Sequence, residues 1–550
     1  MLRWLRLASL SGALLAAGPA AARSGAVATE HPLAAEAGAE LLRDGGTAVD
    51  AAVAAAAVVC VVHPSSCGLG GGGFALVHLA DGRDAALDYR ETAPAGATPE
   101  RFRVDGRPAP ALLRAGGLAV AVPGEVAGLT ALHRRFGRLP LARVLAPAIR
   151  LAREGFALGQ ALHLRREIAR AATLLAADPG LRALFLDATG AVPGPEFRVV
   201  QTDLARTLER VAARGRKAFY GGSVAEAVAA AVRARGGVLG TDDLARYRPR
   251  WRRPLVGTFC GRRILAFPPP GSGGVVLTAL GILGHDDLAA LGADGPTLLH
   301  LLASALAQAF TDRARWYGDP AFTAVPLGAL LAPPRLVRLR AGLSAVRTTE
   351  PRATLVPDAG TAHVSVVDTD GNAVALSTTI NTGFGAGLLV PGTGIVLNNE
   401  MDDFVLAPDT PNVYGLVGGA ANVPAPGKRP QSSMSPTVVL RGGRPELVVG
   451  GSGGPFIVSG TLQVVLGVTA LGRELRPAVE APRIHHQGIP AVLSVEPGIA
   501  PGVRAALERV GHRLAPMPAI GAVSAAGLGS DGTPRAAGDP RKDGGATTVP

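Results

Sequence analysis

Thr361 has the residue type and the setting of a nucleophile at the start of a strand. It precedes an alternating run at 363–368 that predicts a β-strand, and an Asp-Gly pair then predicts a hairpin turn before a returning strand at 373–379. If the turn is a three-residue one, Thr379 lies opposite Thr361 and Asn381 lies on the same face. Threonine is also an ordinary strand residue, and a two-residue turn would shift this register by one. Position alone therefore leaves both interpretations open.

Ser452 stands in a second candidate segment, where Gly450, Ser452 and Gly454 fit the G-x-S-x-G pattern of a nucleophile elbow. A predicted strand precedes it and a predicted helix, 456–466, follows, as an elbow requires. The acid and the histidine that a serine nucleophile also needs would come from these downstream residues: Glu480, His485, His486 and His512. The alternative is that consecutive glycines at a helix start expose N–H groups as an oxyanion hole, without a nucleophilic serine.

The glycine-rich segment GLGGGG at 68–73 satisfies G-x-G-x-x-G, a pattern of dinucleotide-binding loops. Such a loop must follow a strand and open a helix. Here the predicted order is reversed, because a helix at 47–62 precedes the glycines and a strand at 74–79 follows them. The sequence therefore disfavours a nucleotide site and predicts a tight backbone turn beside a functional site.

The elements that must position these segments are distributed unevenly along the chain. Helical patterns dominate before residue 360, at 31–43, 47–62, 141–153, 202–214, 224–235 and 275–283. After it, strands follow one another quickly between Gly, Pro and Asn turns, at 363–368, 373–379, 394–397 and 447–450. A helix-rich first part and a strand-rich last part predict an α+β or layered α/β fold.

The composition is that of a folded globular protein. The chain has 550 residues, of which 48% are hydrophobic and 18% charged, with a formal net charge of +12. Nearly all the cations are arginines, because lysine occurs only at Lys217, Lys428 and Lys542. They are scattered, without the clustered basic patch that a nucleic-acid surface requires. We expect no nucleic-acid partner, no cofactor and no metal ion.

The N-terminal residues have the order of a secretory signal. Two early arginines precede an apolar stretch at 7–17, and alanines at 20–22 supply the small residues of a cleavage site. The apolar stretch is shorter than the roughly 20 residues that span a bilayer. We therefore expect residues 1–22 to be a signal peptide, cleaved or retained as an anchor, and the protein to be periplasmic or secreted.

Cysteine usage is compatible with export. Cys60 and Cys67 are close enough in the sequence to bridge a loop in an oxidising compartment, which would leave Cys260 unpaired. Two free buried thiols fit the same spacing. The sequence leaves this choice open.

Several segments, in order along nearly the whole chain, resemble motifs of the gamma-glutamyltransferase family of N-terminal nucleophile hydrolases. They are residues 28–32 (ATEHP), 45–52, 68–74, 360–368, 398–404 (NNEMDDF), 411–415 (PNVYG), 429–437, 481–487 (APRIHHQ) and 539–543 (DPRKD). Such an ordered set is more specific than any one short motif. The resemblance implies an αββα sandwich formed by two subunits that are cut from one precursor.

By this resemblance, Thr361 attacks the carbonyl of Gly360 and the chain is cut between them. Residues 23–360 then form a large, helix-rich subunit, and residues 361–550 form a small, strand-rich subunit that begins with the nucleophile. The freed α-amino group, with an ordinary pKa of about 7.7–8.0, is a usable general base near neutral pH. It overcomes the poor nucleophilicity of an unaided threonine hydroxyl.

The implied substrate is a γ-glutamyl amide such as glutathione, which carries an α-carboxylate and an α-ammonium. The resemblance implies that Arg90, Ser432 and Ser433 bind the carboxylate, and that Asn381, Glu400 and Asp403 bind the ammonium. It also implies that Thr379 orients the nucleophile and that the backbone of Gly453 and Gly454 forms an oxyanion hole. Tyr414 would cover the site from a lid loop at 408–419. The chain departs from many members at Ala362, where they have a second threonine, and from some at Glu400, where they have glutamine.

The leading hypothesis is a γ-glutamyl-enzyme formed at Thr361 and passed to water, amino acids or peptides. The nearest alternative is a glutaryl- or cephalosporin-type acylase of the same superfamily, whose acyl groups lack the α-ammonium that Asp403 is expected to bind. A serine α/β-hydrolase would instead use Ser452 without self-cleavage. A binding protein that never processes is the remaining alternative.

Overall fold

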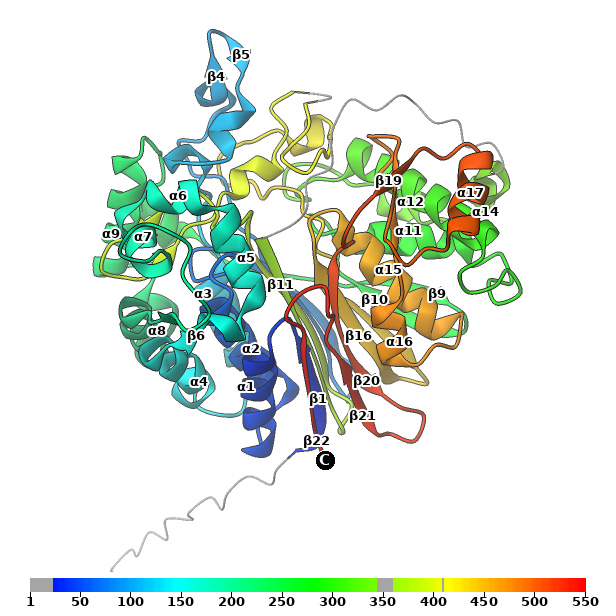
Figure 1. Ribbon diagram of the computed structural model, residues 1–550, viewed down its shortest axis with the longest axis horizontal. Coiled ribbons are helices and arrows are strands. Elements are labelled where there is room, and N and C mark those ends of the chain that lie inside the picture. The colour runs from blue at the N-terminus through cyan, green and yellow to red at the C-terminus, as the bar shows by residue number, and fades with distance from the viewer. Residues whose placement is uncertain (1–22, 344–359, 408–409) are drawn as a thin grey trace, which may run out of the picture.

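Two β-sheets packed face to face form the centre of the molecule, and helices cover the outer face of each sheet (Figure 1). The computed structural model describes residues 23–343, 360–407 and 410–550. The predicted signal peptide, 1–22, lies outside the described residues. The layered α/β prediction is confirmed in the form of an αββα sandwich.

The first sheet has seven strands, each antiparallel to its neighbours. In spatial order they are β22 (Gly545–Val549), β1 (Gly25–Thr29), β11 (Gly360–Asp368), β12 (Ala373–Asn381), β2 (Gly72–His78), β3 (Asp84–Tyr89) and β8 (Arg250–Arg252). The predicted hairpin, β11 and β12, lies at the centre. Because the beginning, middle and end of the chain share this sheet, two pieces cut after residue 360 would stay joined by its hydrogen bonds.

The second sheet has six antiparallel strands and lies against the first. In spatial order they are β21 (Pro534–Ala537), β20 (Ala522–Leu528), β16 (Arg444–Ser452), β15 (Thr437–Arg441), β10 (Arg262–Ala266) and β9 (Leu255–Phe259). Between the sheets, Phe74 stacks on Phe267 with ring centroids 4.2 Å apart, and Val367, Val438 and Val448 are fully buried. Burying each such side chain contributes about 1.5–3 kcal/mol to the stability of the fold, relative to leaving it exposed.

The two helical layers come from different parts of the chain (Figure 1). The layer on the first sheet includes α1 (Pro32–Arg43), α2 (Ala48–Val62), α3 (Glu125–Phe136), α4 (Leu141–Glu154) and α8 (Thr202–Arg214). The layer on the second includes α11 (Gly273–Leu283), α12 (Pro296–Trp316) and α15 (Phe456–Thr469).

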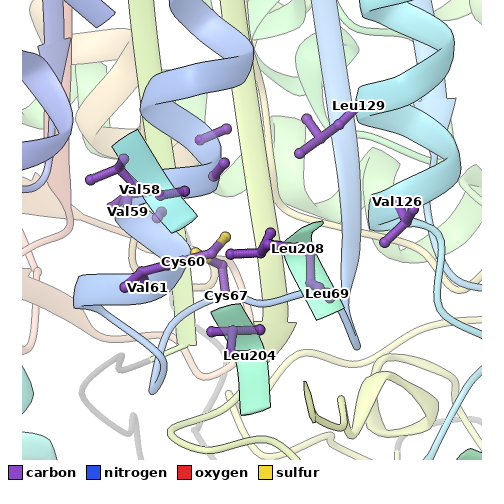
Figure 2. Packing of buried hydrophobic residues seen from close by; sticks show 14 of the residues in the cluster. Val58, Val59, Cys60, Val61, Cys67, Leu69, Val126, Leu129, Leu204 and Leu208 are labelled. Atoms are coloured by element: carbon purple, nitrogen blue, oxygen red, sulfur yellow. The ribbon is translucent and has the colours of Figure 1, made fainter. Parts of the chain in front are cut away.

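Every residue of α2 is buried, because this helix lies between the first sheet and its helical neighbours. A capping box begins the helix: the Asp50 N–H donates to Thr47 Oγ1 at 3.3 Å and the Thr47 N–H donates to Asp50 Oδ2 at 2.8 Å. Figure 2 shows Cys60 and Cys67 packed at the end of this helix against leucines of α8. Both thiols are buried and free.

Shorter elements connect these layers. The helices are α5 (Leu162–Arg170), α6 (Ala172–Ala176), α7 (Pro179–Phe185), α9 (Gly222–Ala234), α10 (Thr241–Arg246), α13 (Leu327–Leu330), α14 (Pro333–Gly342), α16 (Leu475–Glu480) and α17 (Pro501–Arg509). The strands are β4 (Arg103–Val104), β5 (Arg107–Pro108), β6 (Phe156–Ala157), β7 (Arg198–Val199), β13 (Leu389–Val390), β14 (Ile395–Val396), β17 (Ile484–His485), β18 (Leu493–Val495) and β19 (Leu514–Pro516). No helix among the described residues is long and apolar enough to cross a membrane.

The predicted helices are all present within a few residues of their expected ends. The strand predicted at 394–397 is only the short β14. The expectation that strands gather after residue 360 is incomplete, because β1, β9 and β10 precede it. β1 carries no alternating pattern since all five of its residues are buried.

Candidate active site

The β11–β12 hairpin has the predicted register. Thr361 pairs with Thr379, and a bulge between Gly360 and Thr361 brings Gly360 opposite Asn381. The turn is closed by a hydrogen bond from the Asp368 N–H to the Asn372 carbonyl at 3.0 Å, as a three-residue loop requires. This register puts two threonine hydroxyls side by side at the end of the hairpin.

Thr379 connects the two groups on either side of the expected cleavage point. Its hydroxyl donates to the Gly360 carbonyl at 2.7 Å, accepts the Asn381 N–H at 2.8 Å and lies 3.2 Å from Thr361 Oγ1. A hydroxyl has one proton, so the Thr361 hydroxyl must be the donor in the contact between the two threonines. Thr361 Oγ1 therefore does not use a lone pair in this contact, which keeps it available for nucleophilic attack. The hydrogen bond from the Thr379 hydroxyl polarises the Gly360 carbonyl.

The glycine-rich turn at 68–73 lies directly beside this hairpin. A Cβ at Gly71 would stand 2.0 Å from the Thr379 carbonyl oxygen, and one at Gly73 would stand 2.0 Å from the Ser377 carbonyl oxygen. Only glycine permits so close an approach. The predicted tight turn is present, with the Gly71 N–H donating to the Gly68 carbonyl at 3.0 Å, and its glycines pack closely against the strand that carries Thr379.

A buried charge cluster lies next to the two threonines. The Arg90 guanidinium forms ion pairs with Glu400 and Asp403, and its side chain also donates to the carbonyls of Pro430 (3.3 Å) and Gln431 (3.2 Å). Burial raises the pKa of Glu400. Burial alone would lower the pKa of Arg90, but the carboxylates around Arg90 outweigh this effect and raise it. Arg90 therefore stays charged, and its charge opposes the effect of burial on the Glu400 carboxyl group.

One cavity brings together the side chains that the sequence singles out. It is lined by Arg90, Thr361, Thr379, Asn381, Glu400, Asp403, Tyr414, Ser432, Ser433 and Gly454, together with the apolar Met434 and Ile457. Gly453, the remaining predicted site residue, directly precedes Gly454. A hydroxyl, a cation, carboxylates and hydroxyl donors thus face one small volume.

Gly453 and Gly454 form the turn between β16 and α15. Their φ angles are +134° and +53°, conformations that favour glycine. Within the described part of the chain, neither N–H donates a hydrogen bond to a protein acceptor. Backbone donors of this kind can bind a developing oxyanion.

Tyr414 lines the cavity, within the segment predicted to be a lid. The Tyr414 hydroxyl donates to the Asn381 carbonyl at 2.7 Å, and its ring would be 2.8 Å from a Cβ on Gly454. The Asn412 side chain donates to Asp403 Oδ1 at 3.0 Å. The predicted lid is therefore tied both to β12 and to the charge cluster, although residues 408–409 of it lie outside the described residues.

Ser452 does not belong to a catalytic triad. Its hydroxyl accepts from Lys542 Nζ at 3.2 Å, and none of the described histidines bonds to it. The histidines proposed for the elbow have other partners: His485 with Ser459 and Gln487, His486 with Gly488, and His512 with His300. Glu480 lies at the surface beside Arg476. The strand–turn–helix pattern was right, but the tertiary structure leaves the serine without its base.

Lys542 is a neighbour of the nucleophile that sequence reasoning missed. Its Nζ donates to the Thr361 carbonyl at 2.6 Å and forms an ion pair with Glu30 at 2.6 Å. Glu30 in turn accepts the His363 N–H at 3.2 Å. The sequence feature that could have pointed to it is its position: it is a lysine, a rare residue in this chain, within the segment 539–543 that resembles a family motif.

His31, His63 and Asp543 form a group, with the two histidines buried and Asp543 partly buried, whose ligand atoms lie within 4.8 Å of one another. His31 Nδ1 accepts the Leu33 N–H at 3.1 Å, and its Nε2 bonds to the Gln160 carbonyl at 2.8 Å. Burial lowers the pKa of His63 to about 4. Because both His31 nitrogens have backbone partners, these contacts account for the group as a hydrogen-bonded cluster.

The αββα sandwich, with the buried Thr361 at the start of a central strand, has the fold of the N-terminal nucleophile hydrolases. A sequence model of the gamma-glutamyltranspeptidase family matches residues 34–549, and the chain belongs to that family. It is 38% identical over 532 residues to the glutathione hydrolase proenzyme of Escherichia coli (strain K12), across 95% of this chain and 91% of that protein.

Acylases are also among its relatives. The chain is 39% identical to the Acylase ACY 1 proenzyme of Pseudomonas sp. (strain SE83), across 96% of this chain and 94% of that protein. In three dimensions it is similar to a cephalosporin acylase from Bacillus halodurans, with a TM-score of 0.84, 29% identity and 96% of each chain covered.

Proposed function

We propose that this protein is a self-processing γ-glutamyltransferase and glutathione hydrolase whose nucleophile is Thr361. The observation that carries the proposal is the position of the Thr379 hydroxyl, which contacts both the Thr361 hydroxyl and the Gly360 carbonyl. A residue that only stabilised the strand would not need to bridge these two groups. The names of the curated relatives support the substrate class.

The first reaction is cleavage of the bond between Gly360 and Thr361. Thr361 Oγ1 attacks the Gly360 carbonyl carbon, and Thr379 donates to the oxygen that becomes negative. The C–N bond breaks, the Thr361 nitrogen takes up the proton that its hydroxyl released, and an ester results. Water then hydrolyses the ester, leaving a carboxylate on Gly360 and a free amino group on Thr361.

The freed Thr361 then acts on the substrate. Its α-amine accepts the hydroxyl proton while Oγ1 attacks the γ-carbonyl carbon, and the N–H groups of Gly453 and Gly454 bind the oxyanion. The intermediate collapses to a γ-glutamyl ester and the leaving amine takes the proton. Water, an amino acid or a peptide next attacks the ester, which regenerates the hydroxyl.

The charge cluster favours a substrate with two opposite charges. A γ-glutamyl group can exchange ion pairs with it, because its carboxylate takes Arg90 while its ammonium takes Glu400 and Asp403. Ser432, Ser433 and Asn381 line the same cavity. In the proposal, the two serines supply further donors to the carboxylate, and Asn381 helps to bind the ammonium. Breaking a buried ion pair without replacing the partner costs about 3–5 kcal/mol.

A glutaryl- or cephalosporin-type acylase is the second candidate, supported by the acylase relatives. A glutaryl group has the carboxylate only, so it would take Arg90 and leave Glu400 and Asp403 buried without a cation. The presence of Glu400 and Asp403 in the cavity therefore favours γ-glutamyl substrates over glutaryl ones.

The test begins with the purified protein on a denaturing gel and N-terminal sequencing. We expect two chains, one of which begins at Thr361; a single chain, or a cut elsewhere, refutes the mechanism. Thr361→Ala should remain uncut, whereas Ser452→Ala should still be cut. Hydrolysis of γ-glutamyl and glutaryl p-nitroanilides then separates the two candidates, since equal rates would contradict the role given to Asp403.

The proposed mature protein has two chains and lacks the signal peptide. Residues 23–360 form the large subunit, residues 361–550 the small one, and residues 1–22 are a signal peptide for export to the periplasm or the medium. Mass spectrometry of both chains after expression in a host with a secretory pathway checks these ends. A large subunit that retains residue 1 would contradict removal of the signal.

A further inference from the structure

Arg313 is a buried arginine just behind the proposed carboxylate-binding serines. It lies in the last turn of α12 and is 3% exposed. Its Nε donates to Ser272 Oγ at 3.1 Å, and its Nη2 donates to Ser433 Oγ at 3.4 Å. Its side chain thus reaches a residue of the cavity lining without lining the cavity itself.

The charge of Arg313 has no carboxylate of its own. No ion pair joins it to any acid in the described ranges, whereas the other fully buried arginines, Arg90, Arg429 and Arg483, each have one. Burial lowers the pKa of Arg313 to about 10, so it remains charged at neutral pH. A buried cation without a counter-ion is costly, and this one lies beside a site proposed to receive an anion.

The direction of the hydrogen bonds around Arg313 is fixed, because a guanidinium can only donate. Ser272 Oγ accepts a hydrogen bond from it, and the Ser272 hydroxyl donates one to the Ser432 carbonyl at 2.5 Å. Ser433 also accepts from it, so the Ser433 proton must point to another acceptor. Ser432 Oγ accepts the Met434 N–H at 3.2 Å, and its proton is likewise directed elsewhere.

We propose that Arg313 is a positioning residue that orients the Ser433 hydroxyl as a donor to the substrate α-carboxylate and supplies that carboxylate with a second, shielded positive charge. This inference rests on the proposed function, since it assigns a role within the same site. Arg90 and Arg313 then act differently: Arg90 exchanges partners when substrate binds, while Arg313 keeps its serine contacts throughout.

The test compares two anilides that differ only in the α-carboxylate, γ-glutamyl-p-nitroanilide and 4-aminobutyryl-p-nitroanilide. The ratio of their kcat/KM values reports what the carboxylate contributes. Arg313→Met should lower this ratio roughly ten- to hundredfold, the range of one hydrogen bond to a charged group. Arg335→Met is the matched control, because Arg335 pairs with Asp312 beside Arg313 and touches neither serine; its ratio should stay at the wild-type value.

A double variant tests whether Arg313 acts through Ser433. In a Ser433→Ala background, Arg313→Met should lower the ratio by a clearly smaller factor than in the wild type. Fully multiplicative effects would overturn the orienting role. Equal losses on both anilides would overturn the whole inference, because they indicate only a structural role.

Two milder variants decide the matter if Arg313→Met does not fold or process. Arg313→Lys keeps the charge but cannot hold both serines, and Ser272→Ala removes one anchor of the guanidinium. Each should lower the ratio severalfold, and an unchanged ratio in both contradicts the inference. A wild-type protein that does not hydrolyse the γ-glutamyl anilide instead refutes the proposed function itself.

Discussion

Replacing Thr379 with valine removes one hydroxyl while nearly preserving the shape of the side chain. That hydroxyl donates to the Gly360 carbonyl at 2.7 Å, accepts the Asn381 N–H at 2.8 Å and contacts the Thr361 hydroxyl at 3.2 Å. The substitution therefore acts on the proposed cleavage reaction at two points, the polarised carbonyl and the orientation of the nucleophile.

The size of the effect follows from these contacts. Loss of one donor to a developing oxyanion costs about 10²–10³ in rate, so processing should slow by at least that factor. The buried Asn381 N–H also loses the acceptor that Thr379 supplies, which costs about 1–3 kcal/mol of stability. Stability and processing are thus both affected, and they must be measured separately.

The assay follows processing of freshly made precursor on denaturing gels, with thermal unfolding of the same samples. Thr379→Ser retains the hydroxyl and should process within a few fold of the wild type. Thr378→Val is the matched control on the neighbouring residue, because the Thr378 hydroxyl bonds to Glu125 at 2.8 Å rather than to the nucleophile. It should lose stability without a comparable loss in processing rate.

Two results would refute this reasoning. One is wild-type processing by Thr379→Val, which would mean that the hydroxyl is a structural contact only. The other is equal slowing by Thr378→Val and Thr379→Val at equal stability, because the effect would then not depend on contact with Gly360.

Three further predictions concern pH and the lid. Burial raises the pKa of Glu125 to about 8 from an ordinary 4.5, so the free energy of unfolding falls as pH rises through this window, by up to about 1.4 kcal/mol per pH unit. In urea unfolding between pH 5 and 8, the stability of Glu125→Gln should therefore rise relative to that of the wild type. A stability difference that does not change with pH would contradict this. Burial lowers the pKa of His363 to about 3 from 6.5, which has the opposite effect: stability is lost as pH falls from 6.5 toward 3. In the same urea unfolding, the stability of His363→Gln should therefore fall less over this pH range than that of the wild type. Tyr414→Phe removes the bond to the Asn381 carbonyl and should weaken kcat/KM for γ-glutamyl anilide by roughly three- to tenfold in steady-state assays, while an unchanged value would show that the ring alone closes the cavity.

Local patterns predicted the elements around the site because those elements are governed by local physics. The Asp-Gly pair predicted the β11–β12 hairpin, with this register for a three-residue turn. The helical pattern at 47–62 predicted α2, and the order of helix, glycines and strand disfavoured a nucleotide loop. β1 was missed because a strand buried on both faces has no alternation to detect. The elbow pattern at Ser452 was misleading since the position of a distant histidine is not encoded in a short motif.

The sequence by itself determined that Thr361 lies at the start of a hairpin strand, and the ordered motifs identified the residues to be expected around it. The turn length that pairs Thr361 with Thr379 was decided by the structure. It could not determine the pairing of Arg90 with Glu400 and Asp403, because these side chains are brought together only when the chain between them has folded. Lys542 and Arg313 show the same limit. Each lies far from its partners in sequence, and its role depends on the direction and burial of its hydrogen bonds, which only the tertiary structure decides.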